Sequence, residues 1–62
     1  MKAIKIHKVR EITTLSNATI YRLIKQGEFP KQIKLSERSA VWSMDEIDNW
    51  FQEKMDIREA GL

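Results

Sequence analysis

The segment SNATIYRLIKQGEFP, residues 16–30, constrains the fold of this chain more than any other part of it. Ser16 suits the N-cap of a helix, because its hydroxyl can accept a free backbone N–H of the first turn. Gly27 can adopt the left-handed conformation that closes a helix, and Pro30 prevents a restart nearby. Between these signals lies an apolar stripe with i, i+3, i+4 spacing, formed by Ile20, Leu23 and Ile24. The segment predicts an amphipathic helix over residues 16–26.

Weaker patterns flank this helix. Val9 and Ile12 stand three apart, which favours a short helix over about residues 8–13, and the TTLS that follows is typical of a turn. Alternating apolar residues over 33–42, interrupted by SERS, predict a two-stranded hairpin. The alternation in MKAIKI is consistent with a short strand or an extended lead-in. Two helices joined by a short turn and followed by a hairpin predict a mainly α fold, the winged helix-turn-helix.

A third helix is predicted to begin at SMDE, residues 43–46, which has the form of a capping box. We expect the chain beyond Ile57 to fray. The apolar positions of this helix indicate an amphipathic element, and they are Met44, Ile47, Trp50, Phe51 and Met55. We expect Trp42, Trp50 and Phe51 to pack in the core, because so small a domain needs their apolar area. A landing surface for a partner protein is the alternative.

Length and composition limit what the chain can do. Its 62 residues allow one domain (1–62), with a core expected over about residues 4–55 and a frayed tail over 56–62. Such a domain buries only roughly 60% of its unfolded surface, which leaves little room for a catalytic pocket. No nucleophile–base set or paired carboxylates stand out, so we do not expect an enzyme. There is no cysteine, and His7 has no partner at ligand spacing, so we expect neither a metal nor another cofactor.

Charge is divided unevenly along the chain. Residues 1–42 contain nine Lys or Arg and three Asp or Glu, a net charge of +6. Residues 43–62 contain two Lys or Arg and six Asp or Glu, a net charge of −4. The basic part suggests a nucleic-acid surface. No apolar run approaches the roughly 20 residues that a membrane span requires, and no secretory signal is present. We therefore expect a cytoplasmic protein associated with the nucleoid.

The polar face of the 16–26 helix suits the major groove of DNA. Arg22 can form two hydrogen bonds with guanine or hold a phosphate, Asn17 can read adenine, and Lys25 can neutralise a phosphate. The small side chain of Ala18 allows the helix backbone to come close to the DNA. Tyr21 borders the apolar stripe, so we expect it to be half-buried in the core rather than to read a base. Basic residues of the hairpin are expected beside the flanking backbone. The candidate DNA-binding residues are Ser16, Asn17, Ala18, Thr19, Tyr21, Arg22 and Lys25 on the helix, with Lys31, Lys34 and Arg38 on the wing. A merely solvated face is the alternative for each of them.

The run LSNATIYRLIKQGEFPKQIKLSERSAVW, followed by EIDNW, resembles the AlpA-like family of phage and prophage regulators. These are winged helix-turn-helix proteins related to MerR heads and small excisionases. The resemblance covers about residues 4–52 and implies that Arg22 and its neighbours read DNA while Arg38 belongs to the wing. Three positions depart from the family pattern: glycine is usual where Thr14 and Ser36 stand, and a basic residue is frequent at the position of Asn17.

The resemblance implies a sequence-specific regulator of prophage or genomic-island genes that acts on transcription, on excision, or on both. Its main partner would be double-stranded DNA. One such module covers only roughly 600–1,000 Å² of surface, so we expect a monomer in solution and several copies on adjacent DNA sites. The alternative is a protein-interaction module, in which the acidic C-terminal helix recruits an integrase or a polymerase.

Overall fold

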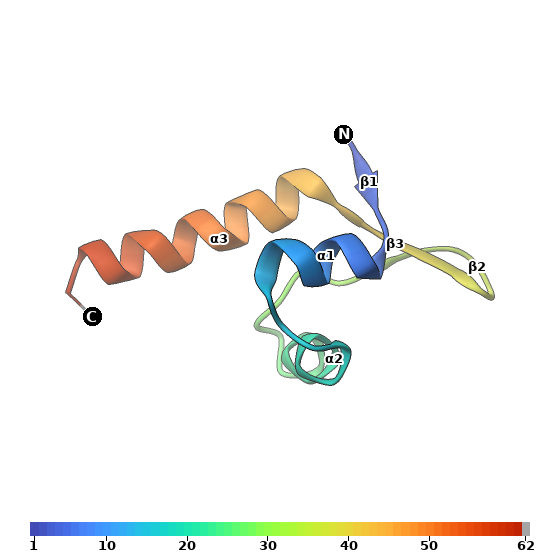
Figure 1. Cartoon of the computed structure of the whole chain (residues 1–62), viewed down its shortest axis with the longest axis horizontal. Coiled ribbons are helices and arrows are strands. Elements are labelled where there is room, and N and C mark those ends of the chain that lie inside the picture. Colours follow the sequence, from blue (N-terminus) through green and yellow to red (C-terminus); the bar gives the residue numbers. More distant parts are fainter. Residues whose placement is uncertain (62) are drawn as a thin grey trace.

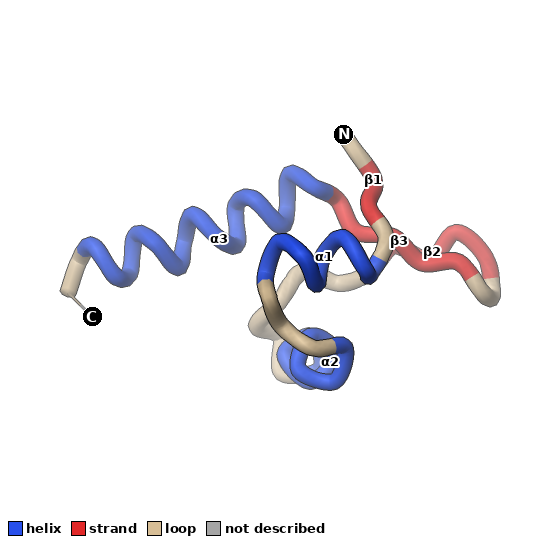
Figure 2. The backbone as a smooth tube through the Cα atoms, in the orientation of Figure 1, coloured by secondary structure: helices blue, strands red, loops and turns tan. Residues whose placement is uncertain are grey.

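The computed structural model describes residues 1–61, and over that range the chain forms three helices and three short strands (Figures 1 and 2). In chain order they are β1 (Ala3–Ile4), α1 (Ile6–Thr13), α2 (Asn17–Lys25), β2 (Ile33–Ser36), β3 (Ser39–Ser43) and α3 (Met44–Glu59). Helices α1 and α2 with their connecting turn form the helix-turn-helix, and β2 with β3 forms the wing. The predicted winged helix-turn-helix fold is confirmed.

The sheet has one strand more than the predicted hairpin. Its order is β1-β3-β2 and both pairings are antiparallel. The N-terminal strand joins because Ile4 pairs with Trp42, and the backbone N–H of Met44 donates to the carbonyl of Lys2 at 2.8 Å. Strand β3 therefore pairs with β2 of the wing along one edge and with β1 along the other.

The turn between α1 and α2 contains a residue in the left-handed region, Thr14, with φ 62°. A side chain with Cβ adopts this region at a cost of roughly 1–2 kcal/mol, which glycine avoids. The family's glycine at this position is thus explained, and the strain expected from its replacement is borne out by φ. The neighbouring Thr13 holds the turn, because its buried hydroxyl donates to the carbonyl of Val9 at 2.8 Å and accepts from the N–H of Leu15 at 3.2 Å.

Both predicted ends of α2 are confirmed. The hydroxyl of Ser16 accepts from the N–H of Thr19 at 3.2 Å, which makes Ser16 the N-cap. At the other end Gly27 has φ 74°, its N–H donates to the carbonyl of Ile24, and that of Glu28 donates to Leu23. These two bonds form a Schellman motif, which ends the helix through the glycine.

The core lies between α1, α2, the sheet and the first half of α3. It consists of Ile4, Val9, Ile20, Phe29, Trp42 and Ile47. Trp42 is fully buried, and its Nε1 donates to the carbonyl of Pro30 at 3.0 Å. The prediction that the tryptophans and Phe51 serve packing is confirmed for Trp42, and Trp50 packs against the same cluster.

The last helix extends well beyond the core (Figure 1). Its predicted cap is present, because the hydroxyl of Ser43 accepts from the N–H of Glu46 at 3.3 Å. Ile47 is fully buried, whereas every residue from Gln52 to Gly61 is exposed. The helix is continuous to Glu59, so the fraying expected beyond Ile57 stays a prediction about the chain in solution.

Candidate nucleic-acid interface

The outward face of α2 carries the predicted polar residues. Ile20 is fully buried on the inner side, while Asn17, Ala18, Arg22 and Lys25 are exposed on the outer side. The helix has no partner element on this face among residues 1–61, so its side chains meet solvent. This is the position that a recognition helix needs.

Tyr21 lies at the boundary between this face and the core. Tyr21 is 43% exposed, and its ring packs edge to face on that of Trp42, with the ring centroids 6.1 Å apart and an interplanar angle of 63°. The prediction that Tyr21 is half core is therefore confirmed. Since Trp42 belongs to β3, the contact also fixes the angle between α2 and the wing.

A shallow hollow of about 240 Å³ connects α2 to the wing. It is lined by Lys5, Ile6, Tyr21, Arg38, Ser39, Ala40 and Trp42. The fold thus brings Arg38 of the wing to the same hollow as Tyr21 of α2, as a joint binding surface requires. It also brings in Lys5, which precedes α1 and is absent from the predicted set. The only sequence signal for Lys5 is the basic N-terminus MKAIKIHKVR.

The wing has two different faces. Residues directly opposite one another in an antiparallel pair share a face, and Lys34 pairs with Ala40, which lines the hollow. Lys34 therefore belongs to the side of the wing that adjoins α2. Ile33 pairs with Val41 and belongs to the opposite side, whereas the pairing is irregular between Lys34 and Ser36, so the alternation of the strand is interrupted at Leu35. Lys31 is exposed in the connection before β2 and does not line the hollow.

The cations of this surface are not engaged in ion pairs within residues 1–61. The two salt bridges there join Lys8 to Glu11 at 3.5 Å and Arg58 to Glu59 at 3.4 Å. The basic residues of α2, of the wing and of the hollow are in neither: Lys5, Arg22, Lys25, Lys31, Lys34 and Arg38. Their charge is available to a polyanion.

Two predicted contact residues already have a role within α2. The hydroxyl of Ser16 accepts from the N–H of Thr19 and also donates to the Thr19 hydroxyl at 3.0 Å. Both side chains thus stabilise the helix start. A phosphate at this end would be met first by the free backbone N–H groups of Asn17 and Ala18.

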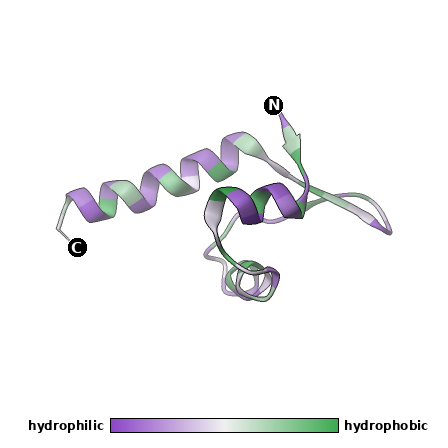
Figure 3. Ribbon diagram, in the orientation of Figure 1, coloured by the Kyte–Doolittle hydropathy of each residue, from purple (hydrophilic) through white to green (hydrophobic). Residues whose placement is uncertain are grey.

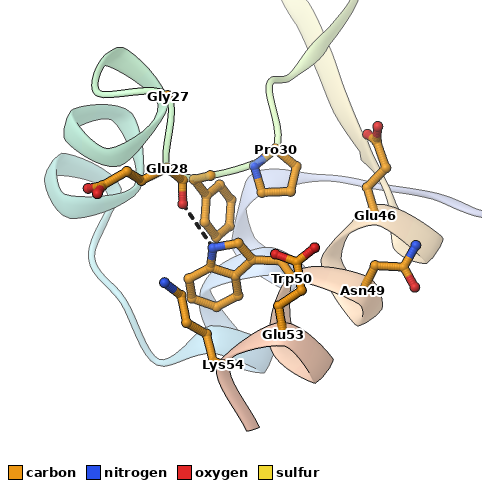
Figure 4. A pocket seen from close by; sticks show the side chains of 9 residues that line it. Gly27, Glu28, Pro30, Glu46, Asn49, Trp50, Glu53 and Lys54 are labelled. Carbon is orange, nitrogen blue, oxygen red and sulfur yellow. Dashed lines mark hydrogen bonds between the residues drawn. The ribbon is translucent and has the colours of Figure 1, made fainter. Parts of the chain in front are cut away.

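A second concave surface lies between the α2–β2 connection and α3 (Figure 4). Its floor is aromatic, since the rings of Phe29 and Trp50 meet edge to face with centroids 4.8 Å apart. The Nε1 of Trp50 donates to the carbonyl of Glu28 at 2.9 Å, which joins the segment after α2 to α3. The carboxylates of Glu28, Glu46 and Glu53 line this groove and would repel phosphate.

Comparison with known proteins gives the family. The family model described as "Prophage CP4-57 regulatory protein (AlpA)" matches residues 2–55, most of the chain. The chain belongs to the AlpA family. It is also 33% identical over 58 residues to "Uncharacterized protein ORF88" of Enterobacteria phage P4, an alignment that covers 94% of this chain. The chain spans 66% of that phage protein's length, just under two thirds.

Much of the AlpA pattern in this chain is structural. Gly27 closes α2, Phe29 is buried, and the two tryptophans hold the connection between α2 and β2 through its carbonyl groups. Other residues of this pattern reach solvent, among them Tyr21, Arg22 and Arg38. The family assignment thus agrees with a phage regulatory role.

Other kinds of site have little support in the described part of the chain. Over residues 1–61 no group of three or more metal-ligating side chains is clustered. No helix within that range is long and apolar enough to cross a membrane. The AlpA family is a regulatory one, which agrees with the expectation that the chain is not an enzyme.

Proposed function

We propose that this AlpA-family protein binds double-stranded DNA in a sequence-specific manner and thereby regulates prophage or genomic-island genes. Helix α2 enters the major groove, and the wing follows the neighbouring backbone. The bound protein controls a promoter or alters the DNA path so that an integrase excises the element. It acts in the cytoplasm at the nucleoid, as a monomer in solution and as several copies on adjacent sites.

One observation carries this proposal: two cations from distant parts of the chain line one hollow together with a residue of α2, whose outer face carries further cations. Lys5 before α1, Tyr21 on α2 and Arg38 on the wing line one hollow, with Arg22 and Lys25 on the exposed face of α2. If the outer face of α2 were merely solvated, the fold would have no need to bring basic residues of the wing and the N-terminus next to it. Basic side chains that neutralise phosphates supply most of the affinity for DNA.

The roles within the surface follow from side-chain chemistry. Arg22 is exposed near the middle of α2, where its guanidinium can form two bonds to guanine. Asn17 at the helix start can read adenine. Lys25, Lys31, Lys34 and Arg38 hold phosphates, and Ser16 and Thr19 fix the end of α2 that faces the backbone.

The test is selection of DNA sequences by the purified protein alone, followed by a salt titration on the selected duplex. Arg22→Ala should weaken binding by about 1–3 kcal/mol and relax the preference at one base pair. Arg58→Ala is the matched control, because it removes the same charge from the exposed far end of α3. Selection that recovers no preferred sequence, or equal losses for the two variants, would overturn the proposal.

A second candidate function is recruitment of an integrase or polymerase through α3. It is favoured by the exposed, acidic second half of this helix and by the acidic groove beside it. The two functions differ in a gel shift with the purified protein. Binding without any added protein supports the first, and binding only in the presence of the integrase or polymerase supports the second.

A further inference from the structure

The groove between the α2–β2 connection and α3, here called the acidic groove, has no part in DNA binding (Figure 4). Its volume is about 420 Å³, and it shares no residue with the hollow between α2 and the wing. The hollow is lined by two cations, Lys5 and Arg38, and by no acid. The charged residues of the groove have a net charge of −2, and they are Glu28, Glu46, Glu53 and Lys54. These two surfaces therefore attract ligands of opposite charge.

Helix stability accounts for only one of the three groove carboxylates. Glu46 is in the first turn of α3, where the helix dipole favours an acid. Glu28 follows the C-terminal end of α2, where the dipole disfavours one. Glu53 has no basic residue three or four positions away on α3, so it forms no stabilising helical ion pair. Neither Glu28 nor Glu53 is in a salt bridge within residues 1–61, which leaves both charges available to a ligand.

The indole of Trp50 lies in the centre of the groove and already accepts a cation. The Nζ of Lys54, one turn further along α3, stands over the Trp50 ring at 5.5 Å from its centroid. The ring is held in place, because its Nε1 donates to the carbonyl of Glu28 and it packs edge to face with Phe29. In Figure 4 Lys54 lies on one side of this ring and Glu53 on the other. The groove thus offers a cation a fixed aromatic ring with a carboxylate beside it.

An incoming arginine can replace the Lys54 ammonium at this ring. Lys54 is exposed and is in neither salt bridge of residues 1–61, so only a weak contact holds it over the indole. A guanidinium is planar and less strongly hydrated than an ammonium. It can therefore stack on an aromatic ring and form two parallel hydrogen bonds with a carboxylate.

The groove also has an apolar part, which a free cation would leave uncovered. Pro30 and Trp50 line it and are half-buried, so part of each meets solvent. Apolar and polar bands alternate along α3, and the groove includes both kinds of residue from this helix (Figure 3). A ligand that carries an apolar side chain next to its cation fits this combination, as a peptide segment does.

We propose that the acidic groove binds an arginine-containing, partly apolar peptide segment of a different protein. The guanidinium stacks on Trp50 in place of the Lys54 ammonium and pairs with Glu53, while the apolar neighbour packs against Pro30. DNA is excluded as the ligand, because its phosphates would meet three carboxylates. A second copy of this chain offers no such segment, since its four arginines lie in helices or in the turn of the wing.

This proposal rests on the second candidate function, recruitment of another protein through α3. It places the contact in the groove beside the first half of the helix instead of on the exposed second half. It also names the chemistry that a recruited partner must supply. Because the groove and the hollow share no residue, the protein can hold this segment and DNA at the same time.

The first test is an NMR titration of the labelled protein with a capped peptide in which arginines alternate with leucines. The chain has two tryptophans and gives two indole N–H signals, of which the buried Trp42 serves as the internal control. We expect a Kd in the millimolar range, movement of the Trp50 signal and an unmoved Trp42 signal. The same peptide with citrulline, a neutral isostere of arginine, should leave the Trp50 signal unmoved.

Matched variants test the individual contacts. Glu53→Gln should weaken peptide binding roughly 1.5–5-fold, the range of an exposed ion pair. Asp48→Asn removes the same charge from a part of α3 outside the groove and should leave binding unchanged. Lys54→Ala should strengthen binding roughly 2–5-fold, because it frees the ring. Arg58→Ala, which removes a cation further along α3, should change it less.

Other results would overturn the proposal. An unmoved Trp50 signal, or equal binding of the arginine and citrulline peptides, would show that the groove does not recognise a cation. Equal losses for Glu53→Gln and Asp48→Asn would indicate a general attraction to an acidic helix. Movement of the Trp50 signal by a selected DNA duplex would assign the groove to DNA. Failure of the protein to bind any duplex would instead overturn the proposed DNA function and leave the peptide result standing.

Discussion

Replacement of Thr14 by glycine should stabilise the domain, although it removes a side chain. Thr14 has φ 62°, a conformation that costs a residue with Cβ roughly 1–2 kcal/mol and glycine almost nothing. Glycine adds freedom to the unfolded chain, which offsets about 0.4–1 kcal/mol of that gain. Thr14 is exposed, so little packing is lost. The net gain lies between about 0 and 1.6 kcal/mol, with a centre of about 0.8 kcal/mol.

Thermal unfolding followed by circular dichroism measures this effect. For a domain of this size 1 kcal/mol corresponds to roughly 4–8 °C, so Thr14→Gly should raise Tm by several degrees. Thr14→Ala is the matched control, because it shortens the side chain and keeps the Cβ that causes the strain. The reasoning fails if glycine lowers Tm, or if alanine raises it as much as glycine does.

Three further changes test separate parts of the account. Ser16→Ala removes the cap of α2 and should cost about 1 kcal/mol of unfolding free energy in a urea titration, whereas Ser16→Gly should cost only a few tenths. Trp50→Phe removes the bond from Nε1 to the carbonyl of Glu28 and should cost about 0.5–1.5 kcal/mol in the same titration, with no loss of helix content. Lys5→Ala should weaken binding to all DNA sequences alike and reduce the salt slope by about 1, while Lys8→Ala, which removes the same charge from α1, should leave the slope nearly unchanged.

Helix α2 could be predicted because its ends are marked by local signals. Ser16 and Gly27 act within a few residues of themselves, through one capping bond and one left-handed backbone position. Its buried stripe depends only on helical spacing. The start of α1 could not be predicted so well: it begins at Ile6 rather than near residue 8, and its N-cap Lys5 makes no side-chain capping bond that a sequence would reveal.

Long-range contacts decide what the sequence left open. The alternation in MKAIKI allowed a short strand or an extended lead-in, and the strand Ala3–Ile4 forms because it pairs with Ser43 and Trp42, about forty residues away in the chain. The presence of Lys5 in the hollow follows from the same pairing. The candidate surface was thus predicted in its helix and wing, and the N-terminal contribution emerged only from the tertiary structure.

The central claim is that the outward face of α2 and the adjoining side of the wing contact a DNA duplex. NMR titration of the labelled protein with a selected single-site duplex tests it residue by residue. The account predicts the largest shift changes at Asn17, Tyr21, Arg22, Lys34 and Arg38, with residues 52–59 of α3 unaffected. Changes concentrated on α3, with the signals of α2 unmoved, would contradict it.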